Sequence, residues 1–354
     1  MRKAFAEALL RAANEEKLDR EAIVILLSAL PGEEERALYS LADAFRARYV
    51  GDEVHLRGVI EFSNHCRRRC LYCGLRADNR SLARYRMQPE EILAAARRGV
   101  ELGYGTIVLQ SGEDPWYTAE MLADLVAAIK ELGVAVTLCV GERPREEYKR
   151  WREAGADRYL LKQETANPEL YQRLHPDMSW EERLTRLRWL KDLGYQVGAG
   201  NIVGLPGQTL EDLAADLLLL RELEVEMAGI GPLIPHPDTP LGGCPAGSLP
   251  LTYRVLAVAR LVIPWAHLPA TTAVGTLDPN GRRLALQRGA NVVMPNLTPG
   301  KYRAHYQIYP GKICLQEEPE DCRECLEGMI RSLGRRVGRG PGHGLKAQAI
   351  APGI

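Results

Sequence analysis

Val54-HLRGVIEFSNHCRRRCLY-Cys73 joins an apolar, strand-like run to three closely spaced cysteines, Cys66, Cys70 and Cys73. Three thiolates cannot fill a tetrahedral metal site, so a metal centre held here keeps one position open. In a 4Fe-4S cluster each thiolate binds one iron, and three cysteines leave the fourth iron for a ligand that is not protein. The alternative is a structural zinc site with a distant fourth ligand, although zinc sites favour paired Cys-x2-Cys spacing.

Short apolar or β-branched segments alternate with helix-periodic segments along most of the chain. Eight strands are predicted, at Val54–Phe62, Thr106–Gln110, Ala135–Val140, Arg158–Lys162, Gln196–Val203, Met227–Gly231, Ala270–Ala273 and Asn291–Met294. Helices are predicted at Pro89–Leu102, Ala119–Leu132, Glu146–Ala154, Trp180–Leu193, Leu210–Leu223, Leu251–Val262 and Asn280–Arg288. Strand and helix alternating eight times indicate an α/β fold, a (β/α)8 TIM barrel of parallel strands.

The same pattern divides the chain into three parts. Residues 1–50 read as an N-terminal helical extension, residues 51–300 as the barrel, and residues 301–354 as a C-terminal extension. Within the last part, residues 331–354 carry four arginines among several glycines such as Gly338, Gly340, Gly342 and Gly344, which predicts a basic and mobile tail.

Composition excludes several classes of partner. Lys plus Arg equals Asp plus Glu at 46 each, so no net field recruits nucleic acid or an anionic membrane. Acidic residues interrupt the apolar residues of the N-terminus, unlike in a signal peptide, and charges and prolines interrupt residues 255–277. We therefore expect a cytoplasmic protein, in which eight cysteines favour metal ligation over disulfides.

A second cysteine group, Cys314, Cys322 and Cys325, follows the last predicted barrel strand. Again there are three thiolates, which suit a second Fe-S cluster with one exchangeable ligand. Zinc with water or a histidine as fourth ligand and a set of free thiols remain the alternatives. We expect this group to lie outside the barrel lumen, while Cys139 and Cys244 stand alone as ordinary thiols.

Barrel enzymes carry their chemistry at the C-terminal ends of the strands, where this chain has Ser111-Gly112-Glu113 and Glu164. Together with the cysteine run, these residues resemble the radical S-adenosylmethionine (SAM) superfamily, in which the free iron chelates SAM. The resemblance implies that Ser111, Gly112 and Glu113 form the turn beside the methionine moiety, with Glu113 or nearby carbonyls binding its ammonium group. It also implies further SAM contacts from Glu164, Arg183, Gly200, Ile202 and Tyr72.

Longer segments resemble one family within this superfamily, the HydE maturases of FeFe hydrogenase. The segments are residues 49–55, 60–64, 70–76, 109–115, 203–209, 229–232, 234–240, 269–272 and 309–314. Biotin synthase and methylornithine synthase are relatives of this family. One departure stands at the end of the fourth strand, where Lys162-Gln163 replaces the Arg-His of family members. Lysine is a point charge and arginine a planar fork, so anion recognition is expected to differ there.

The resemblance implies a reaction and its partners. The reduced cluster would cleave SAM to a 5′-deoxyadenosyl radical, which attacks the sulfur of a cysteine-bound iron dicarbonyl cyanide, with other maturases and a reductant protein as partners. The implied substrate cavity is lined by Lys162, Gln163, Met227, Thr271, Thr272 and Tyr306. The alternatives are a radical mutase or sulfur-inserting enzyme acting on a small organic substrate, and a non-catalytic Fe-S carrier.

Overall fold

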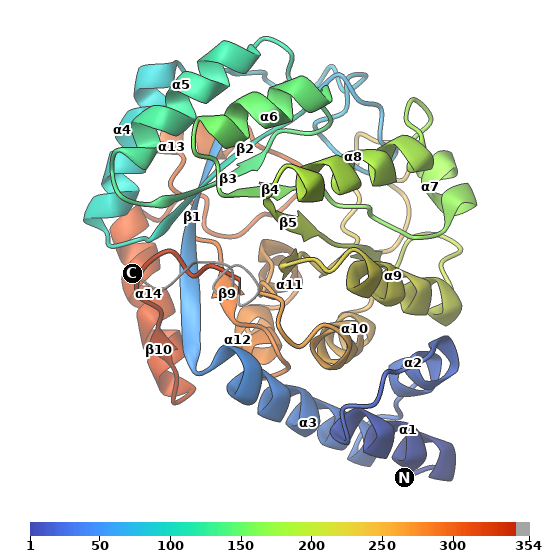
Figure 1. The fold of residues 1–354 in the computed structure, drawn as a ribbon. Coiled ribbons are helices and arrows are strands. Elements are labelled where there is room, and N and C mark those ends of the chain that lie inside the picture. The colour runs from blue at the N-terminus through green and yellow to red at the C-terminus, as the bar shows by residue number, and fades with distance from the viewer. Residues whose placement is uncertain (345–354) are drawn as a thin grey trace.

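The computed structural model describes residues 1–344, and residues 345–354 lie outside the described part. Six parallel strands pair in the order β1-β2-β3-β4-β5-β7. They are β1 (Glu53–Ser63), β2 (Thr106–Ser111), β3 (Ala135–Cys139), β4 (Arg158–Leu160), β5 (Gln196–Ala199) and β7 (Met227–Ala228). Figure 1 shows these strands inside a layer of helices.

Two further segments close the sheet into a ring. Met227 of β7 bridges His267 in parallel, and Pro269 in turn bridges Val292 of β9 (Val292–Val293). The β9 strand pairs in parallel with β1, at His55 and Leu56. Six strands plus residues 267–270 and β9 give eight positions, so the predicted (β/α)8 barrel is confirmed.

Three predicted strands differ in their limits from the observed ones. The strand expected at 196–203 splits into β5 and β6 (Ile202–Val203), and the one expected at 227–231 splits into β7 and β8 (Gly231–Pro232). The β6 and β8 strands pair as a separate ribbon. The seventh strand lies at residues 267–270, before the expected 270–273, because Thr272 already begins α11 (Thr272–Leu277).

Helices cover the outside of the barrel (Figure 1). They are α4 (Pro89–Glu101), α5 (Ala119–Lys130), α6 (Arg145–Glu153), α7 (Pro168–Leu174), α8 (Trp180–Asp192), α9 (Leu210–Glu222), α10 (Leu249–Val262), α12 (Gly281–Leu286) and α13 (Gly300–Arg303). Thr209 begins α9 with a capping box closed by Asp212. None of the helices within residues 1–344 has the length and apolar character of a membrane span.

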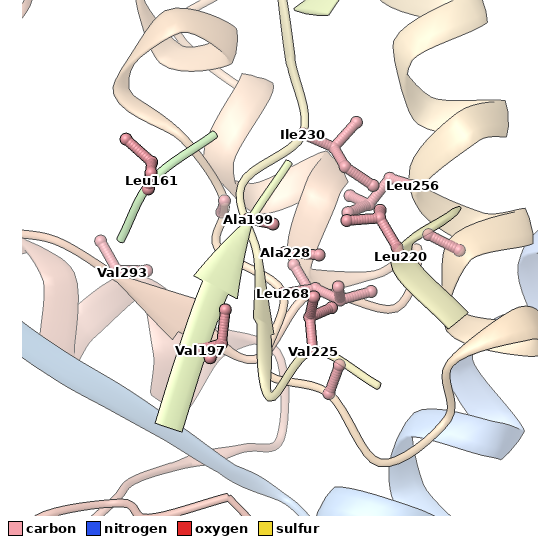
Figure 2. Close-up of a cluster of buried hydrophobic side chains, with 14 of the residues drawn as sticks. Leu161, Val197, Ala199, Leu220, Val225, Ala228, Ile230, Leu256, Leu268 and Val293 are labelled. Atoms are coloured by element: carbon pink, nitrogen blue, oxygen red, sulfur yellow. The ribbon is translucent and has the colours of Figure 1, made fainter. Parts of the chain in front are cut away.

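Apolar side chains fill the layer between strands and helices. In Figure 2, Val197 and Ala199 of β5 lie in one cluster with Leu220 of α9 and Leu256 of α10. All four are almost completely buried. Burial of this kind stabilises the barrel by roughly 1.5–3 kcal/mol for each fully enclosed large aliphatic side chain.

Three N-terminal helices, α1 (Lys3–Ala13), α2 (Arg20–Leu27) and α3 (Glu33–Val50), precede β1. The α3 helix packs against α10, and α2 packs against α9. They therefore brace the outer helices on one side of the barrel, as Figure 1 shows at the blue end of the chain.

The described part of the C-terminal extension, up to residue 344, packs on the barrel, and residues 345–354 of the predicted mobile tail lie outside the described part. Helix α14 (Pro319–Ser332) leads into β10 (Arg336–Val337), which pairs in parallel with the start of β1. Arg335 is buried and donates hydrogen bonds to the carbonyl groups of Leu286 and Ala290. A buried guanidinium group needs hydrogen-bond acceptors, so these bonds hold the segment around Arg335 against the barrel.

Residues 338–344 then cross the N-terminal ends of the barrel strands. Arg158 Nη2 donates to Pro341 O at 2.7 Å and to Gly342 O at 3.0 Å, and Arg57 Nη2 donates to Gly342 O at 3.2 Å. Thr106, the first residue of β2, also donates to Pro341 O. The segment thus closes the end of the barrel opposite to the catalytic end.

Candidate active site

A cavity of about 410 Å³ lies at the C-terminal ends of the strands. Gln110 and Ser111 reach it from β2, Cys139 from β3 and Leu160 from β4. The predicted residues that line it are Cys66, Cys70, Cys73, Tyr72, Ser111, Gly112, Glu113, Lys162, Glu164, Arg183, Ile202, Met227, Thr271, Thr272 and Tyr306. One enclosed space therefore brings together side chains that are more than 200 positions apart in the sequence.

The three cysteines lie on a loop after β1 that backbone hydrogen bonds fix from several sides. Leu71 N donates to Leu174 O at 3.0 Å, and Gly74 N donates to Ile308 O at 2.8 Å. Asn64 Nδ2 donates to the carbonyl groups of Ala83 and His305. The loop conformation is thus held by groups other than the thiols.

The surroundings of the thiols fit a 4Fe-4S cluster. Glu113 N donates to Cys66 Sγ at 3.3 Å. Burial raises the pKa of all three thiols, that of Cys73 to about 12, so thiolates here require a cationic partner such as iron. Within residues 1–344, no three His, Cys, Asp or Glu side chains converge on a point that would hold a single metal ion. This spacing favours a cluster, in which each thiolate binds its own iron, over zinc.

Gly112 leaves room for such a cluster loop because it has no side chain. A Cβ atom at this position would lie 2.2 Å from His65 O and 2.8 Å from Cys66 Cβ. The β2 turn therefore packs directly on the cysteine loop. Any larger residue would displace Cys66.

The Glu113 carboxylate, one candidate for the SAM ammonium group, already has protein partners. Arg67 Nε donates to it at 2.6 Å, Arg68 Nε lies 2.8 Å away, and Glu142 N donates to it at 2.9 Å. Two backbone carbonyl groups of this turn also have partners, since Gly112 O accepts from Ser111 Oγ at 2.6 Å and Glu113 O accepts from Arg67 N at 3.0 Å.

Glu142 is a central residue to which the sequence assigned no role. It is 1% exposed and lies within ion-pair distance of Arg183 Nε at 2.6 Å, Arg68 Nη2 at 3.0 Å and Arg186 Nε at 3.8 Å. Its position directly after β3 was the available signal. The carboxylate connects the cysteine loop to α8, because Arg68 belongs to the first and Arg183 to the second.

Arg183 retains part of its guanidinium for a ligand. Its Nη1 donates to Lys162 O, and its Nη2 makes a weak contact, 4.0 Å from Met178 Sδ. Burial lowers the pKa of Arg183, but Tyr171 and Glu142 outweigh burial and hold the pKa above its usual value. The cavity therefore has a fixed positive charge at this wall.

Glu164 has a left-handed backbone, with φ +64°. Its N–H donates to Gly200 O, and its carbonyl oxygen accepts from Ile202 N, both at 3.0 Å. The carboxylate lines the cavity, 3.0 Å from Lys162 Nζ. Strained residues of this kind persist only where the surroundings hold them, and they concentrate at functional sites.

Two predicted cavity residues lie behind the wall instead of lining it. Gln163 is fully buried, and its Oε1 accepts from Gly200 N at 2.7 Å. Gly200 has φ +147° and packs on Gly229, where a Cβ atom would lie 2.1 Å from the carbonyl oxygen. Gln163 stands between Lys162 and Glu164, which both line the cavity, and alternate residues near a strand end face opposite sides of the sheet. Lys162 and Gln163 are the two residues that differ from the Arg-His of family members, and of these only Lys162 faces the cavity.

Tyr72 lines the cavity with its hydroxyl group 2.9 Å from His175 Nε2. Burial raises the pKa of this phenol well above its usual value, so the ring presents a neutral face. An uncharged aromatic ring beside the cysteines suits stacking with a planar group such as adenine.

The second cysteine group lies beside the main cavity without lining it. Cys314 and Cys322 line a cavity of about 100 Å³ that shares Thr272 and Tyr309, among others, with the larger one. A hydrogen bond from Cys322 lowers the pKa of Cys314 to about 6. Cys325 lies one turn further along α14 and is exposed.

Comparisons with known proteins agree with this site. The profile of the radical SAM superfamily matches residues 60–220. The [FeFe] hydrogenase maturase subunit HydE of Thermotoga maritima is 58% identical over 86% of this chain and 87% of that protein. The 3-methylornithine synthase of Methanosarcina acetivorans is 31% identical over 76% of each chain.

Solved structures give the same fold. The crystal structure of methylornithine synthase PylB matches with a TM-score of 0.81 at 26% identity, covering 94% of this chain and 97% of that one. The structure of HydG, a maturase of the FeFe hydrogenase, matches with a TM-score of 0.74 at 22% identity, covering 82% and 68%. The second likeness concerns the fold alone.

Proposed function

Because this chain belongs to the HydE family of the radical SAM superfamily, we propose that it acts in assembly of the di-iron subcluster of FeFe hydrogenase. The near full-length similarity to Thermotoga maritima HydE carries this proposal. The chain is a radical SAM enzyme, with a 4Fe-4S cluster and SAM as its cofactors. An Fe-S carrier would have no use for the cavity of about 410 Å³ beside the cysteines.

The residues of the cavity divide into two proposed roles. Cys66, Cys70 and Cys73 hold the cluster, which supplies one-electron reduction of SAM when bound. Glu164, Arg183, Tyr72 and Ile202, with the Ser111–Glu113 turn, bind and orient SAM between the cluster and the lumen. The barrel wall excludes water, so that a reactive species formed inside meets only the substrate.

Lys162, Met227, Thr271, Thr272 and Tyr306 form the proposed substrate wall. The substrate proposed for them is an iron dicarbonyl cyanide bound to cysteine. Lys162 offers this anionic ligand a cation, although its ammonium group is shared with Glu164 at 3.0 Å.

We also propose a cytoplasmic setting, in which SAM, a reductant protein and the other hydrogenase maturases are the partners. All eight cysteines are free thiols in the structure. Thiols of this kind stay reduced in the cytoplasm.

Complementation tests the substrate. Expressed as the only HydE-type maturase beside an FeFe hydrogenase and its other two maturases, this chain is expected to restore hydrogen evolution. A Lys162→Arg variant is tested in parallel because Lys162 is the one altered residue that faces the cavity. The measurement is hydrogen evolved per unit of hydrogenase.

The outcomes separate three readings. Activity with the natural chain supports the maturase. Activity with Lys162→Arg alone, while the natural chain still cleaves SAM, assigns the natural chain another substrate. If both fail with full cluster loading, the hydrogenase assignment falls, and a radical reaction on a small organic substrate takes its place, as the 31% identity to 3-methylornithine synthase suggests.

For the second group, we propose an Fe-S cluster at Cys314, Cys322 and Cys325. Replacing all three with serine is expected to lower the iron content and leave formation of 5′-deoxyadenosine from SAM unchanged, because the first cluster has its own ligands. Iron analysis and chromatography of 5′-deoxyadenosine measure both effects. Loss of SAM cleavage in a folded variant that keeps its first cluster would contradict this assignment.

A further inference from the structure

A buried carboxyl group lies behind the turn that carries Glu164. Asp216 of α9 is 0% exposed, and its Oδ1 accepts a hydrogen bond from Ala166 N. Its side chain also lies beside the side chains of Thr165 and Asn201. No lysine, arginine or histidine within residues 1–344 forms an ion pair with it. Burying a carboxyl group without a cationic partner costs free energy of folding, and a site with only a structural role avoids that cost.

Asp216 contacts both sides of the Glu164 turn. Thr165 and Ala166 directly follow Glu164, and Asn201 bridges Glu164 in parallel and directly precedes Ile202. The carboxyl group therefore ties together the chain segments that present Glu164 and Ile202 to the cavity. Because Glu164 has a left-handed φ of +64°, its conformation needs such support.

The hydrogen-bonding pattern fits a protonated carboxyl group. Asp216 Oδ2 and both polar side-chain atoms of Asn201 are buried and have no hydrogen-bond partner among residues 1–344. A proton on Asp216 Oδ2 supplies a donor for Asn201 Oδ1. Burial raises the pKa of Asp216 to about 8, and the charge of Asp212, one turn earlier on α9, acts in the same direction.

The other charged groups near this turn are paired elsewhere. Asp212 accepts from Asn167 Nδ2 at 2.8 Å, and Arg20 of α2 lies on its side of the helix. Glu164 pairs with Lys162 on the cavity side. Asp216 is therefore neutral at pH 7 and becomes an unpaired buried anion as the pH rises above 8.

We propose that Asp216 is a positioning residue for SAM binding, which holds the Glu164 turn through its hydrogen bond to Ala166 and its contacts with Thr165 and Asn201. This inference deepens the proposed SAM site and rests on it, since it takes Glu164 and Ile202 as SAM contacts. Asp216 does not itself line the cavity.

The test measures SAM affinity of anaerobically reconstituted protein by equilibrium dialysis from pH 6.5 to 9.5. Asp216→Ala is expected to weaken SAM binding about tenfold, the equivalent of one or two lost hydrogen bonds. Asp216→Asn keeps an acceptor for Ala166 N and a donor for Asn201, so it binds SAM as the natural chain does at pH 7. Affinity of the natural chain falls as the pH passes 8, whereas that of Asp216→Asn stays flat.

Asp212→Asn is the matched control, because it removes a carboxylate from α9 one helical turn before Asp216. Its SAM affinity is expected within about twofold of the natural value. Natural affinity in iron-loaded Asp216→Ala would overturn the proposal. If that variant does not fold, a decline above pH 8 that persists in Asp216→Asn overturns it equally.

Glu164→Gln separates this inference from the proposed function. If SAM affinity is unchanged in that variant, Glu164 does not contact SAM, and the proposed role of Asp216 falls as well. Failure of hydrogenase complementation with these SAM affinities intact concerns only the substrate.

Discussion

Protein in which Cys66, Cys70 and Cys73 are all replaced by alanine will form no 5′-deoxyadenosine from SAM and dithionite. The loss is expected to be complete, because Cys66, Cys70 and Cys73 line the main cavity together, whereas none of Cys314, Cys322 and Cys325 lines it. Each thiolate binds one iron of the cluster, and the open iron is the group that binds SAM. Chromatography of 5′-deoxyadenosine and iron analysis measure the result.

The fold is expected to survive this change. Asn64, Leu71 and Gly74 fix the loop through hydrogen bonds to the backbone of other segments, and none of these bonds involves a thiol. Cys244→Ala is the control for thiol number, because Cys244 is a partly buried thiol outside the cavity lining. Continued SAM cleavage by the triple variant would show that the cluster lies elsewhere.

Glu142→Gln is expected to lower the free energy of unfolding by about 3–5 kcal/mol, the usual cost of breaking a buried ion pair by removing one partner. The carboxylate lies 2.6 Å from Arg183 and 3.0 Å from Arg68, so Arg183 would lose its main anion, whereas Arg68 would keep Glu113 at 2.8 Å. Urea denaturation of the natural and variant proteins measures the difference.

Glu182→Gln provides a matched control for this effect. Glu182 pairs with Arg186 at 3.0 Å, and Arg186 also belongs to the Glu142 network, but the Glu182 side chain is 63% exposed. An exposed pair of this kind contributes at most about 1 kcal/mol. Equal effects of the two substitutions would mean that the buried network contributes no more than a surface pair.

The Glu142 network also links stability to the site. Arg183 loses its orienting partner in Glu142→Gln, so weaker SAM binding is expected to accompany the loss of stability. This coupling between the cysteine loop and α8 exists only because two distant arginines meet one carboxylate.

Local patterns were enough to predict much of the fold. The 3.6- and 2-residue periods identified the barrel and the main outer helices, because each period reflects which side of an element is buried. Strand limits were wrong where a single residue changes the backbone direction. Gly200, with φ +147°, separates β5 from β6, and nothing in the period of the flanking residues reports this.

The site divides in the same way. Cys66, Cys70 and Cys73 were predictable because three thiolates this close define their own chemistry. The side of the sheet to which the Gln163 side chain points was not predictable, since a shift of one residue near a strand end reverses it. Glu142 and Asp216 were missed because their partners come from other strands and helices.

The sequence by itself thus determined the barrel and the run of three cysteines after its first strand, since spacing and periodicity are properties of neighbouring residues. Its resemblance to the radical SAM superfamily indicated most of the other residues that line the cavity. Only the tertiary structure decided which carboxylates brace the cavity, that the second cysteine group adjoins it, and that residues 338–344 close the far end of the barrel. The reason is physical. Pairing and burial of a charge depend on groups that the folded chain brings together across 41 and 74 residues for Glu142 and 50 for Asp216, and no local pattern records them.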